Sequence, residues 1–101
     1  MSVRMGLIEA QDALSWEPAA SQWDVICANM FSEILIAIFP KIRRALKPNG
    51  TLIVSGILQE QAEETLGAAE RAGLTVNSVK EVGKWVTARI QAVHHSEISS
   101  R

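Results

Sequence analysis

The sequence predicts an α/β fold in which two parallel strands with crossover helices are followed by an antiparallel hairpin at the C-terminus. Three observations support this class. Two short apolar runs, 24–29 (DVICAN) and 51–55 (TLIVS), do not alternate and are typical of strands buried on both faces. A helical pattern separates the two runs, so a crossover should make them parallel. Residues 85–93 alternate apolar with polar side chains, which indicates a half-buried strand.

Composition limits the classes of function. The chain has 101 residues, 48% of them hydrophobic, and a formal net charge of −1. This balance offers no basic footprint for nucleic acid, and no apolar run approaches the roughly 20 residues of a membrane span. Its one cysteine, Cys27, excludes an internal disulfide, and the N-terminus does not resemble a signal peptide. We therefore expect a cytoplasmic protein with no direct nucleic-acid or membrane partner, and Cys27 as a small core side chain.

The segment before the first buried run should supply a strand and a surface loop. Residues 3–9 (VRMGLIE) form a strand pattern that Gly6 weakens. Residues 14–22 contain Pro18 and small side chains, which is typical of a loop. Trp16 and Trp23 bracket this loop. They either cover the edge of the sheet or form an aromatic platform for a substrate.

The first crossover helix should begin just after Asn29. Ser32 is a preferred N-cap and Glu33 suits the positive first turn. The apolar stripe continues through Leu35, Ile38, Ile42 and Leu46. Pro40 predicts a kink or a break into two helical pieces, and residues 47–50 (KPNG) should stop the helix.

The second strand should end at Gly56, on the same edge of the sheet as Asn29. Ligands of open α/β sheets bind outside the carboxyl ends of such strands, so Asn29 is the leading candidate for a functional side chain. Gly56 either walls a ligand pocket or serves only the backbone of a tight turn. A helix over 59–72 follows, with Gly73 as its left-handed stop, and then a hairpin turning at residues 83–84.

Three stretches resemble one known family. ANMFSE (28–33) is similar to the A-N-[IL]-x-x-E signature of the ribosomal protein L-eleven methyltransferases, SGILQEQAE (55–63) matches a second stretch, and GKWV (83–86) is close to their terminal GEWV. The order and spacing agree from about residue 3 to about residue 91. The resemblance implies the C-terminal half of a Rossmann-like class I methyltransferase sheet, S-adenosylmethionine as cofactor and a ribosomal protein as substrate.

The same resemblance implies a set of site residues. Asn29 would be catalytic and would contact the cofactor or the incoming amine, since a carboxamide accepts an N–H without carrying charge. Gly56 and Leu58 belong to the turn that partly walls the family's cofactor pocket. Asp12 follows the first strand, where an acidic residue contacts the adenine amino group in similar methyltransferases. From the residues alone, Asp12 is better explained as the cap of a turn.

The chain also departs from the family. The glycine-rich cofactor loop, the acidic residue after it and the amino-terminal substrate-binding domain would precede Met1, so residues 1–93 are expected to form a partial catalytic domain and 94–101 a polar tail. Losing two or three hydrogen-bonding groups removes roughly 2–9 kcal/mol of cofactor affinity, so the isolated chain should not turn over. The strand beside residues 24–29 would be missing as well. That unpaired edge, or the apolar face, predicts self-association.

Two other functions are consistent with the residues. A non-catalytic α/β module would keep the half-fold for interaction or dimerisation. A methyltransferase acting on a small molecule is the other alternative, because Met30, Phe31 and Ser32 depart from the ANILAE-like form of the signature. No metal ligand set accompanies the adjacent His94 and His95 in the tail.

Overall fold

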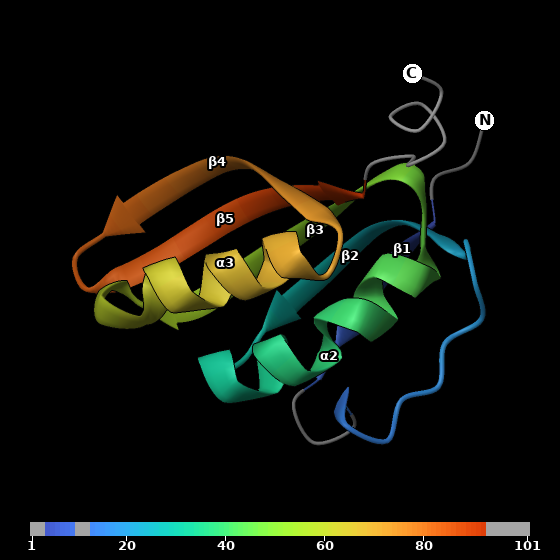
Figure 1. Ribbon diagram of the computed structural model, residues 1–101, viewed down its shortest axis with the longest axis horizontal. Coiled ribbons are helices and arrows are strands. Elements are labelled where there is room, and N and C mark those ends of the chain that lie inside the picture. The colour runs from blue at the N-terminus through green and yellow to red at the C-terminus, as the bar shows by residue number, and fades with distance from the viewer. Residues whose placement is uncertain (1–3, 10–12, 93–101) are drawn as a thin grey trace.

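One five-stranded sheet organises the computed structural model, which describes residues 4–9 and 13–92 (Figure 1). Its strands are β1 (Met5–Ile8), β2 (Trp23–Asn29), β3 (Leu46–Leu58), β4 (Leu74–Val82) and β5 (Trp85–Ala92), in the order β1-β2-β3-β5-β4. β1, β2 and β3 are parallel, and β5 runs antiparallel to both β3 and β4. The predicted α/β class, the parallel crossover and the C-terminal hairpin are therefore confirmed, and the weak strand pattern at 3–9 forms β1.

Both long helices, α2 (Ser32–Ala45) and α3 (Ala62–Arg71), lie on the same side of this sheet (Figure 1). A short 3₁₀ turn, η1 (Gln59–Gln61), precedes α3. Alternate strand residues point at the helices and are buried, whereas their neighbours point to the opposite side, which we call the back face. The strand residues in the core include Ile26, Ala28, Leu52, Val54, Val86, Ala88 and Ile90.

The expectation that β2 and β3 are buried on both faces is wrong for this structure. The back-face side chains Val25 and Cys27 are only half-buried, and Ile53 is 37% exposed. Cys27 therefore lies outside the core cluster in which it was expected. The cause is architectural, because neither α2 nor α3 covers the back face.

The expected unpaired edge at β2 is also wrong. β1 pairs with β2 in parallel from Met5 opposite Val25 to Ile8 opposite Ala28. The backbone N–H and C=O groups on this side of β2 therefore bond to residues 5–8. The edge of β2 that was expected to be unpaired has a neighbouring strand. Among the residues that the structure describes, the strands at the edges of the sheet are β1 and β4.

The start of α2 differs from its sequence prediction. Phe31 occupies the N-cap with extended backbone and no side-chain cap, and its carbonyl accepts from the N–H groups of Ile34 and Leu35. Ser32 is the first helical residue, is buried, and donates its hydroxyl to Gln61 Oε1 at 3.1 Å. The serine therefore links the starts of two helices, a tertiary role that takes precedence over capping. Further along, α2 is continuous through Pro40, so the predicted break into two pieces does not occur.

Strand β3 is longer than the predicted 51–55. The helix ends at Ala45, earlier than the KPNG stop, and residues 46–50 already belong to β3, with Asn49 at φ +66°. At the other end Gly56 does not terminate the strand. It lies in an irregular step of the β3–β5 register between Val54 and Ile57, with φ +82°. A bulge here lets β3 continue to Leu58 while changing direction.

The remaining elements follow the sequence closely. Gly73, at φ +94°, ends the α3 segment as expected. β5 buries Val86, Ala88, Ile90 and Ala92 in strict alternation, and the hairpin turns at 83–84. Ala69 of α3 is buried, whereas Ala62 and Leu66 are only partly buried. Thr65 is fully buried instead because its hydroxyl donates to the Gln61 carbonyl at 2.8 Å.

Candidate functional site

Asn29 is the last residue of β2 and lies at the carboxyl edge of the parallel strands. It pairs with Ser55 of β3, and its side chain is exposed. Among the residues that the structure describes, its carboxamide forms no hydrogen bond. The chain then passes through Met30, which is buried, and enters α2 after Phe31. Asn29 is therefore held by ordered backbone on both sides and presents an available amide where α/β sheets bind ligands.

Gly56 lies directly against the Asn29 side chain. A Cβ at residue 56 would overlap Asn29 Oδ1, and φ +82° is itself a conformation that other residues rarely adopt. The positive φ supports the backbone role predicted for this glycine, whereas its role in walling a ligand pocket stays a prediction. The bulge needs glycine for its backbone, and the absence of a side chain also leaves room for the Asn29 carboxamide.

A surface hollow of about 240 Å³ opens beside this contact. It is lined by Asn29, Met30, Phe31, Gly56 and Trp85. Phe31 is 68% exposed and Trp85 is 42% exposed, so two aromatic rings border one polar amide. Pockets that enclose a whole cofactor or substrate measure about 300–1,000 Å³, so this hollow is too small to enclose one.

The hairpin of β4 and β5 brings the GKWV stretch (83–86) next to Asn29 and Gly56. Trp85 pairs with Leu58 in the β3–β5 register, and the Gln59 N–H donates to the Lys84 carbonyl at 2.8 Å. The Lys84 ammonium lies 5.6 Å from the centroid of the Trp85 ring. The three stretches 28–33, 55–63 and 83–86, far apart in sequence, thus meet at one end of the sheet.

The predicted site residues have different outcomes. Asn29 and Gly56 are in contact. Leu58 is half-buried two residues beyond Gly56 and does not line the hollow. Asp12 lies outside the described residues. The sequence analysis gave no site role to Trp85 or Phe31, which also line the hollow. Two signals could have found them. Trp85 belongs to the GKWV match, and exposed aromatic residues near strand ends often mark binding surfaces.

No residue that lines the hollow titrates near neutral pH. The lining offers a carboxamide, a thioether, two aromatic rings and backbone. Such a set can hold and orient a reactant and exclude water, but it supplies no side-chain general acid or base. Within residues 4–9 and 13–92 there is also no group of three His, Cys, Asp or Glu placed to hold a metal.

A second hollow, of about 260 Å³, lies near β1. Its lining is Gly6, Leu7, Ile8, Glu9, Trp16, Trp23 and Ile26. The Trp23 ring packs on Gly6, and the Arg4 guanidinium lies 4.8 Å from the centroid of that ring. Trp16 and Trp23 both pack against the core, which supports their predicted role of covering the edge of the sheet.

A parallel sheet with a crossover helix and an antiparallel C-terminal hairpin define a class of fold, the Rossmann-like α/β proteins. Solved structures agree. A methyltransferase from Mesorhizobium loti described as S-adenosylmethionine-dependent has a TM-score of 0.67 at 11% identity, which is a likeness of fold alone. It covers 79% of this chain and 66% of that one.

The family can be stated more closely. A model of the family "Ribosomal protein L11 methyltransferase (PrmA)" matches residues 3–93, and the chain belongs to this family. The ribosomal protein L11 methyltransferase of Pelotomaculum thermopropionicum is 38% identical over 78 residues, which cover 75% of this chain and 25% of that protein. The solved L11 methylase of Lactobacillus delbrueckii subsp. bulgaricus has a TM-score of 0.68 at 27% identity, over 72% of this chain and 38% of that one.

The matched part is a minor share of these relatives. The enzyme of Prochlorococcus marinus, 33% identical over 82 residues, is covered over 27% of its length. The chain thus spans about a quarter of the curated relatives, in their C-terminal part. Separately, no helix in the described part of the chain is long and apolar enough to cross a membrane.

Proposed function

We propose that residues 1–93 are part of the catalytic domain of a cytoplasmic protein methyltransferase that uses S-adenosylmethionine and modifies a ribosomal protein. Residues 94–101 would be a tail. The observation that carries the proposal is the contact between Asn29 and Gly56 beside Trp85, because it joins the three family stretches in one wall. The names of the curated relatives refer to ribosomal protein L11, and we propose the same substrate for the protein that contains this chain.

The composition of this wall suits methyl transfer. Moving a methyl group from a sulfonium to an amine needs a neutral lone pair aligned with the methyl carbon and a site that excludes water. The Asn29 carboxamide oxygen would accept an N–H of the incoming amine and so direct its lone pair. Phe31 and Trp85 would flank the amine and reduce its contact with water. Gly56 and Leu58 would contact the cofactor, and Asp12 its adenine amino group.

The hollow of about 240 Å³ is too small to enclose a whole cofactor, and the chain contains no glycine-rich phosphate-type loop. We therefore propose that residues 1–101 alone bind S-adenosylmethionine weakly and do not turn over. The whole activity would belong to a longer protein in which this wall is completed.

Calorimetric titration of S-adenosylmethionine into the purified chain tests the role of Asn29. We expect saturable binding that Asn29→Ala weakens about tenfold, equivalent to about 1.4 kcal/mol. Asn77→Ala is the matched control, because this exposed amide lies on β4 and bonds only to Gln91 in the described part of the chain. Equal binding by all three proteins would remove Asn29 from the site. No heat at millimolar cofactor would show that this chain by itself lacks a working site.

We further propose that the chain self-associates. The parallel half of the sheet exposes apolar side chains on the back face, with Met5 at 65% and Leu7 at 70% exposure. This observation is independent of the methyl-transfer site and would also suit the interaction-module alternative.

A further inference from the structure

Gln59, the first residue of η1, bonds to the β4–β5 hairpin through both its backbone and its side chain. Its N–H donates to the Lys84 carbonyl at 2.8 Å, and its side-chain Nε2 donates to Glu81 Oε1 at 2.9 Å. Glu81 lies near the end of β4 and Lys84 lies just before β5, so the two acceptors are on the two sides of the hairpin turn. Figure 1 shows this turn at the same end of the molecule as the start of the α3 segment.

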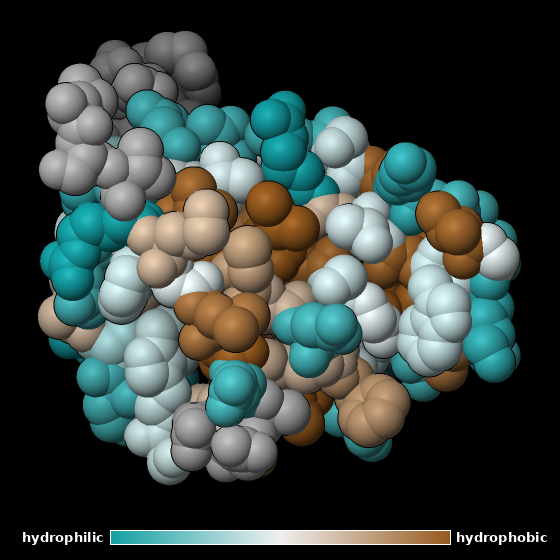
Figure 2. Space-filling model, turned by 180° about the vertical axis from the view of Figure 1, so that it is seen from behind, coloured by the Kyte–Doolittle hydropathy of each residue, from teal (hydrophilic) through white to brown (hydrophobic). Residues whose placement is uncertain are grey.

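Few other contacts hold this end of the hairpin. In β4 the only buried residue is Leu74, at the opposite end of the strand, and residues 77–82 are all exposed. In the β3–β5 register two residue pairs remain beyond the irregular step, and the last of them joins Leu58 to Trp85. Figure 2, which views the molecule from behind, shows most hydrophobic residues of this side in the middle, and hydrophilic residues among those at the hairpin end. Hydrogen bonds therefore contribute much of what fixes the turn.

The place of the turn decides where the Trp85 ring lies. Trp85 directly follows Lys84 and borders the hollow together with Asn29 and Gly56. Its side chain is 42% exposed, so the interior of the protein fixes only part of it. A shift of the turn would move this ring relative to the Asn29 amide, which belongs to a different strand. The shape of the hollow therefore depends on the two bonds that Gln59 makes.

We propose that Gln59 is a positioning residue of the candidate site, which fastens the hairpin to η1 so that the Trp85 ring flanks the incoming amine. The inference rests on the proposed function, because that function gives the ring its role. Gln59 does not line the hollow and acts through Trp85. Misplacing a group that orients a reactant by about 1 Å can cost about a hundredfold in rate, so a residue outside the hollow can still control how the amine is held.

Two other contacts near the turn do not place it relative to the rest of the molecule. The Lys84 ammonium lies 5.6 Å from the centroid of the Trp85 ring, but both residues belong to the hairpin and move together. The bond from Asn77 Nδ2 to Gln91 Oε1, at 3.2 Å, joins β4 to β5 and also lies within the hairpin. Gln59 differs because it belongs to the segment between β3 and α3.

Exchanging the donor and the acceptor tests the side-chain bond. Gln59→Glu removes the donor and places two carboxylates side by side, where like charges repel. Combining Gln59→Glu with Glu81→Gln restores one donor and one acceptor in the reverse order. Asn77→Asp is the matched control, because it makes the same change from amide to carboxylate in another exposed bond of the hairpin, farther from the turn.

Two NMR signals of the purified chain report the position of the hairpin. They are the indole N–H of Trp85, assigned with Trp85→Phe, and the hydrogen exchange of the Gln59 backbone amide, which donates to Lys84. Gln59→Glu should shift the indole signal and speed the exchange by about threefold or more. The double variant should restore both signals, and Asn77→Asp should change neither.

Titration with N-acetyl-lysinamide, a small carrier of a primary amine, connects the hairpin to the site. The dissociation constant, followed through the side-chain amide signals of Asn29, should rise about threefold or more in Gln59→Glu. It should return to the parent value in the double variant and stay there in Asn77→Asp. A residue that serves stability alone would leave this constant unchanged.

Three results would overturn the proposal. Unchanged indole and exchange signals in Gln59→Glu would show that β5 holds the Trp85 ring without Gln59. A shifted ring with unchanged binding of the amine would leave Gln59 without an effect on the site. A double variant that recovers nothing would assign the loss to the added charge at residue 59 and not to the bond with residue 81.

Failure of the proposed function gives a different result. If the parent chain does not bind the amine at all, the hollow loses its role as an amine site, and the positioning role of Gln59 falls with it. The indole and exchange signals would still show whether Gln59 holds the hairpin, so the two failures are distinguishable.

Discussion

At the scale of single residues, the pair Asn29 and Gly56 links backbone conformation to the candidate site. Gly56 combines a positive φ with a neighbour that leaves no space for a Cβ. Gly83 also has a positive φ, +61°, but nothing lies within 4 Å of the position of its missing Cβ. Replacing each glycine by alanine therefore distinguishes two costs. Residue 83 tests the positive φ alone, and residue 56 tests the positive φ together with the clash with Asn29.

Gly56→Ala should destabilise the fold more than Gly83→Ala does. The backbone term costs about 1–3 kcal/mol at either position, and only residue 56 adds the overlap with the Asn29 amide. Urea unfolding of both variants measures the difference. Combining Gly56→Ala with Asn29→Ala should recover the additional loss, whereas Asn29→Ala should not rescue Gly83→Ala. Equal losses for the two glycines would contradict the contact.

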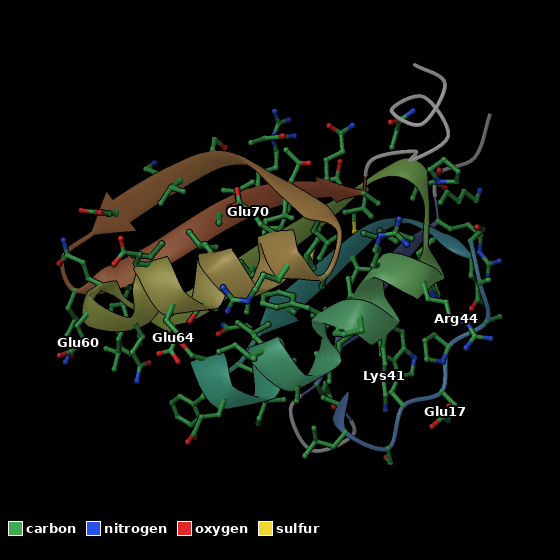
Figure 3. All side chains as sticks on the ribbon, viewed as in Figure 1. Glu17, Lys41, Arg44, Glu60, Glu64 and Glu70 are labelled. Carbon is green, nitrogen blue, oxygen red and sulfur yellow. The ribbon has the colours of Figure 1, made fainter. Side chains whose placement is uncertain are left out.

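At the scale of elements, the basic end of α2 anchors segments distant in sequence. Lys41 Nζ donates to the Leu14 carbonyl at 2.8 Å, and Arg43 Nε donates to the Gly73 carbonyl at 3.3 Å. Lys47, just beyond the helix, pairs with Asp24 at 3.3 Å. Figure 3 shows Lys41 and Arg44 on the side of α2 near the loop that carries Glu17, whereas Glu60, Glu64 and Glu70 project from η1 and α3.

Adjacent arginines on α2 should respond differently to truncation. Arg43→Ala removes the hydrogen bond that ties α2 to the turn after α3 and should cost about 1 kcal/mol. Arg44 makes no side-chain hydrogen bond or ion pair within the described residues, so Arg44→Ala should change stability by less than about 0.5 kcal/mol. Thermal or urea unfolding compares them. If the two variants lost the same stability, the positive charge at the end of α2, and not the hydrogen bond from Arg43 to Gly73, would explain the loss.

At the scale of the whole molecule, one carboxylate holds the amino edge of the parallel strands together. Asp24 of β2 accepts the Arg4 N–H before β1 at 2.9 Å and pairs with Lys47 of β3. The hydrogen bond from the Arg4 backbone is the main cause that lowers the pKa of Asp24 below 3.8, and Lys47 adds to it. β1 has only four residues, so this carboxylate contributes to its attachment.

A lowered pKa in the folded state makes the contribution of Asp24 depend on pH. Its stabilisation is fully present above the unfolded value near 3.8 and is lost as pH falls through the lower folded value. The stability difference between the chain and its Asp24→Asn variant, measured by urea unfolding, should therefore shrink as pH falls from about 6 to about 2. A difference that stays constant over this range would contradict the assignment.

The sequence by itself determined the class of fold and two residues of the candidate site, Asn29 and Gly56. Apolar runs, a helical stripe and an alternating strand are local signals of burial, so β2, α2, α3, β5 and their order were predictable from the residues. The strand-end position of Asn29 was predictable for the same reason. The pattern of the second strand placed Gly56 at the same edge of the sheet, and the structure shows the two residues in contact.

Tertiary structure alone decided which partners these elements have. The β1 segment occupies the edge of β2, Ser32 bonds to Gln61 instead of capping α2, and β3 passes through Gly56 instead of ending there. Each outcome depends on groups at least 20 residues apart or on strand register, which no local pattern contains. The side on which helices cover the sheet is likewise a property of packing. An apolar residue such as Ile53 predicts burial, but what buries it depends on which polypeptide reaches its side of the sheet.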